Sequence, residues 1–387
     1  MTLWKLNLRH LRAVAEICAR GSVNAAAQAV NLTQPAVTQG VARTEALIGQ
    51  ALFERSSDGM EPLESAHLFV PRILAAVDHI ASARVTMAQV RALILFADQG
   101  SYAAASAASG LSQPSLHRAI GDLSVALRRS LLERRGKGLM LTEAGQRVVR
   151  GFRLARAELE AGLAELAGLQ GRETGRIVIG AMPLSRARIL PAAVAAFHAR
   201  HPDVAVSIVE GSYSELAAPL REGDIDVMIG ALREPSPGPD LVQQALFEDR
   251  PVIIGRAGHP LIPRLAAAEG EAATLTHMAD FPWIVAAPGT PLRSQWERMF
   301  ADANLAPPKV PIECGSVITI REILIKSDFL TLLSRDQLSV ELEAGWVVQL
   351  GAAPSGILRR IGVTTRANWR PTKAQQAFVD ELGRQSS

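Results

Sequence analysis

The spacing of apolar positions along the chain changes near Gly171. Before it, apolar residues recur every three or four positions, as in 90–99 and 143–169, and Gly and Ser residues mark the ends of these segments, which predicts a series of helices. After it, short apolar runs alternate with amphipathic segments, which is typical of strands and helices in turn. We therefore expect a helical N-terminal part followed by an α/β part.

The first 150 residues contain two copies of one unit, displaced by 79 positions. Gly21 and Ser22 recur as Gly100 and Ser101. Between positions 21 and 55, eleven of the 35 residues are identical to the residue 79 positions later. A single ungapped register over this length indicates a duplication.

Each copy has the pattern of a helix-turn-helix. In the second copy a glycine stop and a serine cap start a short alanine-rich helix, and Ser112 with Pro114 begins a further helix over 112–125. The apolar residues of this further helix fall on one side and its polar residues on the other. In such a pair the second helix enters the major groove of DNA with its N-terminal residues leading.

The motifs of the second copy resemble the winged DNA-binding domain of LysR-type transcriptional regulators. The resemblance is carried by Leu-Ser-Gln-Pro-Ser at 111–115, Leu-Leu-Glu-Arg at 131–134 and Leu-Thr-Glu-Ala-Gly at 141–145. It implies a recognition helix at 112–125, a wing around 134–141 and a long linker helix. The chain departs from the family pattern in having two such units, the first of which is degraded after its wing.

These motifs predict the order of the N-terminal domains. A first, divergent winged unit (copy one, 1–64) precedes a connecting helix (65–86), a second winged unit (copy two, 87–142) and a linker helix (143–171). The apolar periodicity of the linker helix is that of a helix that pairs two chains, so a homodimer or homotetramer is expected. Packing of the linker helix within its own chain is the alternative.

The remaining residues, 172–387, are predicted to form an effector-binding domain of two α/β lobes. Strands and helices alternate twice, which predicts parallel sheets covered by helices and a cleft at the carboxyl ends of the strands. Lobe I takes 172–257 and 357–387, and lobe II takes 258–356. This layout is similar to the two-lobed, periplasmic-binding-protein-like effector domain of LysR-type regulators.

The distribution of charge indicates copy two as the main DNA-binding unit. The net charge is +3, but residues 1–171 hold 19 basic and 14 acidic residues, so the basic excess lies in the N-terminal part. Six basic and two acidic residues lie in 112–137, against two basic and three acidic in 33–58. Because neutralising phosphates supplies most sequence-independent affinity, copy two is expected to bind more tightly, while copy one reads bases weakly or serves as a packing or dimer module. The residues expected at the DNA are Gln113, Pro114, Ser115, His117, Arg118, Arg134, Arg135 and Lys137 in copy two, and Gln34, Thr38, Gln39 and Arg43 in copy one.

The effector site is expected where helices start after strands at the cleft. Unpaired N–H groups and the positive helix end favour a carboxylate, phosphate or polyhydroxylated ligand there, so a carboxylate or sugar derivative is predicted. The segments 281–293 and 327–334 also resemble the branch of the family that responds to sugars and aromatic acids. Ordinary N-caps that touch no ligand are the alternative. The candidate residues are Ser185, Arg186, Thr290, Ser316 and Val317, with Cys314 beside them.

Composition and motifs argue against several other classes. Apolar residues make up 48% and charged residues 20% of the chain, and the N-terminus has no apolar signal core, so a cytoplasmic protein without a membrane partner is expected. The sequence has no nucleophile elbow, Gly-rich phosphate loop or metal-ligand spacing, so we expect no enzyme activity, cofactor or metal. The prediction is a ligand-responsive transcription regulator that binds double-stranded DNA. A two-lobed solute-binding or interaction protein without DNA binding is the alternative.

Overall fold

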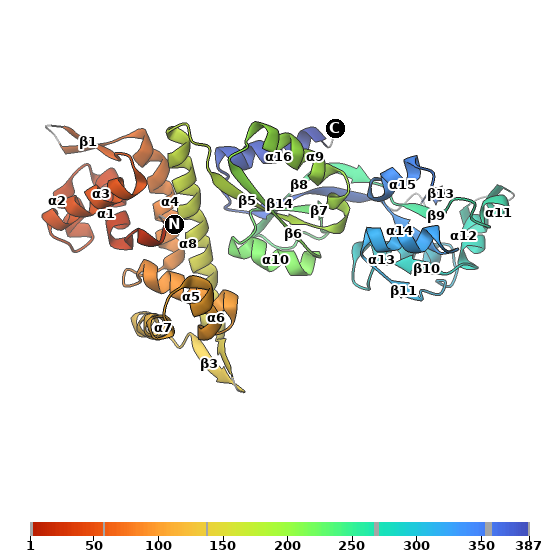
Figure 1. Cartoon of the computed structure of the whole chain (residues 1–387), viewed down its shortest axis with the longest axis horizontal. Helices are drawn as coiled ribbons and strands as arrows, with labels where there is room; N and C mark the ends of the chain where they lie inside the picture. The colour runs from red at the N-terminus through yellow and green to blue at the C-terminus, as the bar shows by residue number, and fades with distance from the viewer. Residues whose placement is uncertain (1–2, 57–58, 137, 267–270, 353–357, 386–387) are drawn as a thin grey trace.

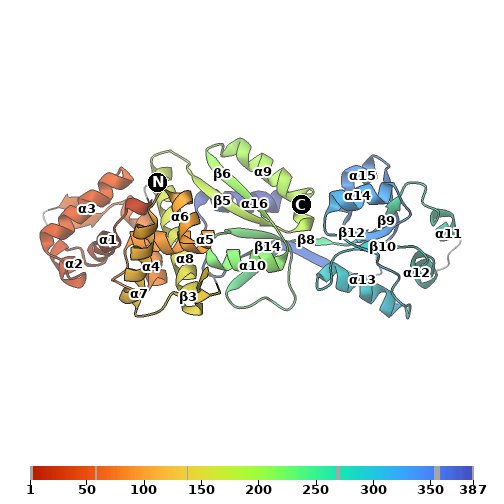
Figure 2. The ribbon, with the colours of Figure 1, turned by 60° about the horizontal axis from the view of Figure 1, so that its bottom comes forward.

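The computed structural model describes residues 3–56, 59–136, 138–266, 271–352 and 358–385. Along its long axis the molecule passes from copy one, through a pair of packed helices beside copy two, to two α/β lobes (Figure 1). The same succession is seen after rotation about that axis (Figure 2). Within the described residues, no helix is both long enough and apolar enough to span a bilayer.

Both copies are winged helix-turn-helix units followed by a longer helix. Copy one comprises η1 (Leu3–Lys5), α1 (Leu8–Arg20), α2 (Val23–Ala29), α3 (Gln34–Ile48) and the strands β1 (Phe53–Ser56) and β2 (Gly59–Pro62), and α4 (Glu64–Ile80) follows. Copy two comprises α5 (Met87–Gln99), α6 (Tyr102–Ser109), α7 (Gln113–Leu127), β3 (Leu132–Arg135) and β4 (Gly138–Leu141), and α8 (Glu143–Leu169) follows. In each copy the two strands pair antiparallel and form the wing.

The repeat shows in how equivalent helices start and end. α1 and α5 both end at a glycine in the left-handed region, Gly21 with φ 66° and Gly100 with φ 72°, where a side chain would be strained. α3 and α7 both begin at a hydroxyl N-cap, Thr33 and Ser112, which accepts a hydrogen bond from the backbone N–H three residues later at 3.4 and 3.3 Å. The predicted recognition helix at 112–125 therefore corresponds to α7.

The linker helix α8 packs along the connecting helix α4 of the same chain. The two helices are antiparallel, because Gly151 lies against the carbonyl of His79 whereas Gly162 lies against Phe69. A Cβ on Gly162 would come within 2.7 Å of the Phe69 ring, so glycine permits this close approach. The apolar face predicted to pair two chains is thus covered by α4 of the same chain, which is the alternative left open by the sequence. The duplication itself supplies a second helix of the same pattern within the chain.

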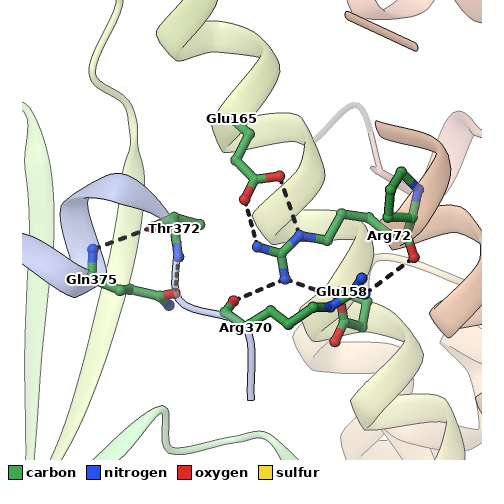
Figure 3. A network of polar contacts seen from close by, with 7 residues as sticks. Arg72, Glu158, Glu165, Arg370, Thr372 and Gln375 are labelled. Carbon is green, nitrogen blue, oxygen red and sulfur yellow. Dashed lines mark hydrogen bonds and ion pairs between the residues drawn. The ribbon is translucent and has the colours of Figure 1, made fainter. Parts of the chain in front are cut away.

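A buried arginine joins these two helices to the effector-binding domain (Figure 3). Arg72 of α4 is 5% exposed and donates to Glu165 (Nε to Oε2, 3.1 Å) and to Glu158 (Nη1 to Oε2, 3.1 Å) of α8. Arg72 also donates a hydrogen bond to the carbonyl of Arg370. The guanidinium of Arg370 in turn donates to Glu158 at 2.9 Å and to the carbonyl of Pro71 at 3.1 Å. Burial opposes the charge of Arg72, but the two carboxylates raise its pKa, so the network keeps it ionised.

Lobe I is a five-stranded mixed sheet in the order β6-β5-β7-β14-β8. β5, β6 and β7 are parallel, and β14 and β8 complete the sheet in antiparallel pairs, so the expected parallel sheet is mixed. Its elements are β5 (Gly175–Ala181), η2 (Pro183–Arg186), α9 (Ile189–Arg200), β6 (Val204–Glu210), α10 (Tyr213–Glu222), β7 (Val227–Ala231), β8 (Leu241–Asp249), β14 (Arg359–Arg366) and α16 (Lys373–Gln385). Phe197 of α9 and Phe378 of α16 meet edge to face over the sheet, with ring centroids 5.5 Å apart.

Lobe II is a second five-stranded mixed sheet, in the order β11-β10-β12-β9-β13. Its elements are β9 (Val252–Arg256), α11 (Ile262–Ala266), α12 (Glu271–Ala279), β10 (Trp283–Val285), α13 (Pro291–Asp302), β11 (Ile312–Glu313), α14 (Val317–Ile325), β12 (Leu330–Leu333), η3 (Arg335–Leu338), α15 (Ser339–Glu343) and β13 (Val347–Ala352). Trp283, Trp296 and Phe300 are fully buried and form an aromatic cluster in its core. β10, β11 and β12 are the parallel strands, whose carboxyl ends point toward the junction with lobe I.

The two lobes are joined where the chain crosses between the sheets. The first crossing runs from β8 to β9, so it comes before the predicted boundary at 257/258, and that boundary was placed too late. β8 and β9 follow one another without a helix, and apolar periodicity gives no sign of the change of sheet there. At the crossing Asp249 and Arg359, side chains 6% and 8% exposed, form an ion pair between adjacent strands.

We predict that Arg72→Ala lowers the free energy of opening of α4 and α8 by about 3 kcal/mol, because it leaves the half-buried carboxylate of Glu165 without its partner and leaves Glu158 with Arg370 alone. Hydrogen exchange at the amides of these helices measures this quantity. Arg147→Ala is the matched control, since Arg147 of α8 pairs with Glu143 in solvent (side chains 63% and 84% exposed) and its loss costs about 0.5 kcal/mol or less. Equal effects of the two substitutions would contradict the structural role given to Arg72.

Candidate DNA interface and effector cavity

The polar edge of α7 faces solvent. Leu116, Ile120 and Leu123 are buried and hold the helix on the body of copy two, which turns the opposite side outward. The ring of His117 lies against Tyr102 of α6, with centroids 5.4 Å apart, at the margin of the exposed side. The predicted contact residues on this helix are all exposed: Gln113, Pro114, Ser115, His117 and Arg118.

The arginines around this edge carry uncompensated charge. Many other arginines of the chain form ion pairs, as Arg153 and Arg156 of α8 do with carboxylates of lobe I. In copy two, over the residues the structure describes, none of the arginines on α7, just after it or on the wing has a carboxylate partner, and all of them are exposed. They are Arg118, Arg128, Arg129, Arg134 and Arg135. Lys137, predicted at the wing, lies outside the described residues. The structure therefore groups five free cations around an exposed helix edge, where they suit phosphate contacts.

Copy one presents the equivalent edge of α3 with less positive charge. Gln34, Gln39 and Arg43 are exposed, and Thr38 is half-buried and donates a hydrogen bond to the carbonyl of Gln34 at 3.1 Å. Burial and the nearby charge of Arg43 together lower the pKa of His10 on α1. A lowered pKa favours neutral His10, so the positive charge at this edge is that of Arg43. The four predicted residues of copy one thus lie together on α3, and among the side chains that the structure describes no cluster of arginines like that of copy two surrounds them.

A cavity of about 290 Å³ lies between lobe I and lobe II. It is bounded by segments that follow the strands of both sheets, including 182–184 after β5, 231–233 after β7 and 286–292 after β10. Most of the wall is apolar, with Leu292, Ile320 and Leu333 on the side of lobe II. Its place at the carboxyl ends of the parallel strands is where open α/β sheets bind ligands.

Of the five residues predicted for the effector site, Thr290 is the one that lines this cavity. Ser185 is fully buried and donates a hydrogen bond to the carbonyl of Met182 at 2.9 Å, so it closes the η2 turn. Arg186 is held by an ion pair with Glu210. Ser316 caps α14 by accepting from the N–H of Thr319 at 3.4 Å. Ser316 and Val317 lie outside the lining, so Thr290 is the predicted residue that the structure places at the cavity, and a ligand role for the other four stays a prediction.

Arg233 is the cavity residue that sequence reasoning missed. Its guanidinium lies 4.4 Å from the centre of the Tyr213 ring, and its Nε is buried without a hydrogen-bond partner. Burial lowers the pKa of Arg233, and no carboxylate pairs with it among the described residues. The other cavity arginine, Arg359, is neutralised by Asp249. Among the described residues that line the cavity, Arg233 is thus the cation free to meet an anion, and a lone arginine after a strand gives no sequence signal.

Comparison with known proteins agrees with this architecture. A family profile described as the LysR substrate binding domain matches residues 170–387, and one described as a bacterial regulatory helix-turn-helix protein of the lysR family matches 8–67 and again 87–146. The HTH-type transcriptional regulator GalR of Pseudomonas putida is 32% identical over 386 residues, which cover 96% of each chain. This relative therefore aligns along both copies.

Two solved structures share the fold over the length of one winged unit and the effector-binding domain. A full-length variant of OxyR from Pseudomonas aeruginosa has a TM-score of 0.54 and 19% identity, and covers 76% of this chain and 97% of its own. CbnR in complex with its target DNA has a TM-score of 0.54 and 16% identity, and covers 77% of this chain and 99% of its own.

Winged helix-turn-helix units joined by a helix to a two-lobed domain with an interlobe cavity define an effector-responsive, DNA-binding regulator. The chain belongs to the LysR family of bacterial transcriptional regulators, since profiles of that family match both copies and the whole effector-binding domain. Its relatives are transcriptional regulators and not enzymes.

We predict that Cys314, which lines the cavity, reacts faster with iodoacetamide than Cys18. Burial raises the pKa of the Cys18 thiol, so at a given pH a smaller fraction of Cys18 is the reactive thiolate than it would be without burial. Cys314 lies at the cavity wall, where a reagent can reach it. Mass spectrometry of the alkylated chain at mildly alkaline pH measures the two rates, with Cys18→Ala and Cys314→Ser as single-thiol controls. Faster labelling of Cys18 would contradict the placement of Cys314 at an accessible cavity wall.

Proposed function

We propose that this LysR-family regulator binds double-stranded DNA mainly through α7 and the β3–β4 wing of copy two. The observation that carries the proposal is the group of five exposed arginines around the exposed edge of α7, none of which has a carboxylate partner in the part of the chain that the structure describes. In this arrangement Gln113, Ser115 and Arg118 reach base edges in the major groove, while Arg134 and Arg135 hold the phosphate backbone. A helix that contacts base edges must present its polar side to solvent in the free protein, and α7 does so.

The effector is a small molecule with a largely apolar body and one anionic group. The apolar wall of the interlobe cavity suits the body, and the unpaired guanidinium of Arg233 suits a carboxylate. The hydroxyl of Thr290 donates to the carbonyl of Ala287 at 2.8 Å and caps α13, so the contribution of this segment is the backbone N–H groups at the start of α13, which favour an anion. This combination favours a carboxylate over a neutral sugar derivative, because a neutral ligand would leave the positive charge of Arg233, whose Nε is buried, without an anionic partner.

Lobe movement reaches the DNA-binding part through the contacts between lobe I and α8. Arg156 of α8 pairs with Asp224 at 2.6 Å, and Arg153 pairs with Glu222 and approaches Asp224 at 3.3 Å. A ligand that binds the closed cleft better than the open one would shift this assembly and alter DNA binding or bending. A nearly complete shift requires a difference in binding free energy of about 5 kcal/mol.

We also propose that the protein works in the cytoplasm as a homodimer or homotetramer. Because α4 covers the apolar face of α8, association between chains uses the effector-binding domains. β6 supports this, since it is an edge strand of its sheet with Ile208 and Val209 exposed by 45% and 39%.

We expect Arg118→Ala to weaken binding to the DNA upstream of the gene more than Arg43→Ala does. Loss of a base contact from α7 costs about 1–3 kcal/mol, on the order of 10-fold or more in affinity. Titrated footprints at several salt concentrations measure both variants, and Arg298→Ala on α13, an exposed arginine of lobe II, controls for the loss of one positive charge. Equal losses would overturn the ranking of the two copies, and a loss limited to Arg43→Ala would reverse it.

We expect Arg233→Met to abolish stabilisation by anionic ligands. A panel of small carboxylic acids with apolar bodies, each compared with its neutral amide, is tested by thermal unfolding, since a ligand that binds the folded state raises the Tm. The wild type responds to at least one acid and not to its amide, and the variant responds to neither. Arg188→Met is the control, because Arg188 is exposed and lies outside the cavity lining. An unchanged response of Arg233→Met would place the anion site elsewhere.

A further inference from the structure

The pairing of α4 with α8 relates two copies of the same helix. α4 begins at Glu64 and α8 at Glu143, which are 79 positions apart, the displacement of the repeat. Five buried residues of α4 have buried counterparts 79 positions later on α8. The pairs are Ala66 with Gly145, Val70 with Val149, Ile73 with Phe152, Ala76 with Ala155, and Ile80 with Leu159. Each helix therefore uses the same face to contact the other.

The antiparallel contact has the geometry of a two-fold axis between the copies. About one turn along each helix from the contact of His79 with Gly151 lie Ala76 and Ala155, which are counterparts and are both buried. A contact in which a residue meets its own counterpart, in antiparallel helices, is the mark of an isologous interface. Small side chains at this point allow the helices to approach closely.

Each winged unit is fixed at its own end of this helix pair. Copy one lies at the C-terminal end of α8, where Gln50 donates to the carbonyl of Leu166 at 3.3 Å. Copy two lies at the N-terminal end, where the backbone N–H of Thr142 donates to the carbonyl of Leu131 at 3.0 Å. The structure therefore places two reading helices, α3 and α7, on units related by the repeat and held by one antiparallel seam.

We propose that a single chain carries both DNA-reading units of a pseudo-two-fold pair, so that α7 occupies one half-site and α3 of the same chain a second. The inference rests on the proposed function of α7 and adds a role for copy one. Dimeric helix-turn-helix proteins bind two half-sites because symmetry presents two reading helices, and here the duplication presents both within one chain. The exposed Gln34, Gln39 and Arg43 are the residues of α3 that meet the second half-site.

The two half-sites are bound unequally. Copy two adds the arginines of its α7, the turn after α7 and its wing to the phosphate contacts, whereas the α3 edge carries Arg43 as its cation. Electrostatic affinity grows with the number of phosphates neutralised, so copy two anchors the chain and copy one binds the adjacent half-site weakly. If one chain binds two half-sites, the expected stoichiometry is one chain for every two protected DNA segments.

The first test is a hydroxyl-radical footprint combined with the mass of the protein–DNA complex by native mass spectrometry. We expect two protected segments per chain in the wild type, and in Gln39→Ala/Arg43→Ala a loss on the order of 10-fold at one segment with the other kept. Arg118→Ala weakens both segments, because it removes the anchor, and Arg298→Ala changes neither. An unchanged footprint of the double variant, or one segment per chain, overturns the inference and leaves the role of α7 intact. No effect of Arg118→Ala overturns the proposed function instead.

The second test asks whether the seam forms within one chain. In a background with Cys18→Ala and Cys314→Ser, Ala76→Cys/Ala155→Cys is oxidised, and its mass is compared with and without reductant. We expect a disulfide within a single chain, with both thiols lost and no covalent dimer. Ala155→Cys alone is the control and stays a free thiol. A covalent dimer in either variant, or two free thiols in the double variant, overturns the pseudo-two-fold seam.

Discussion

The antiparallel seam between α4 and α8 determines where every other part of the N-terminal half lies. It buries the apolar faces of both helices, and glycines at 151 and 162 let the backbones approach where a side chain would collide with His79 or Phe69. Copy one and copy two are attached at opposite ends of this seam, and lobe I is attached to its outer side. A change at the seam would therefore move both reading helices and the effector-binding domain together.

The seam is symmetric in its apolar residues and asymmetric in its charged ones. Arg72 of α4 is buried among Glu158, Glu165 and the carbonyl of Arg370, whereas its counterpart 79 positions later is Gly151. A buried guanidinium is costly unless its partners are well placed, and here they are supplied by α8 and by the segment before α16. The asymmetry thus gives lobe I an attachment at Arg72 that has no counterpart at Gly151, in addition to the ion pairs that Arg153 and Arg156 of α8 make with lobe I.

Much of this architecture could be predicted from the sequence, because it rests on local signals. The duplication, the helix caps at Thr33 and Ser112 and the periodicity of 143–169 led directly to two winged units and a linker helix, and alternating strands and helices led to two lobes. The partner of the linker helix could not be predicted, since periodicity shows that a face is apolar but not what covers it. The change of sheet between β8 and β9 has no local signal either, because no helix separates these strands.

The effector cavity shows the same limit. Helix starts after strands are common, and of five residues chosen on that basis Thr290 lines the cavity. Thr290, Ser185 and Ser316 all satisfy local backbone groups, so capping does not distinguish a cavity residue from the others. Arg233 was missed because its importance comes from what surrounds it: a buried Nε, the face of Tyr213 and the lack of a described carboxylate partner. These are tertiary properties, which depend on segments far apart in the chain.

The short connection from α4 to α5 has a consequence for how this regulator behaves at low abundance. Six residues separate Ile80 from Met87, so the two copies are tethered at an effective concentration in the millimolar range, far above that of a scarce regulator in a cell. Dilution that would dissociate two separate chains leaves this pair together. The pairing of the two copies, unlike the association of whole chains, is thereby independent of the amount of protein that the cell makes.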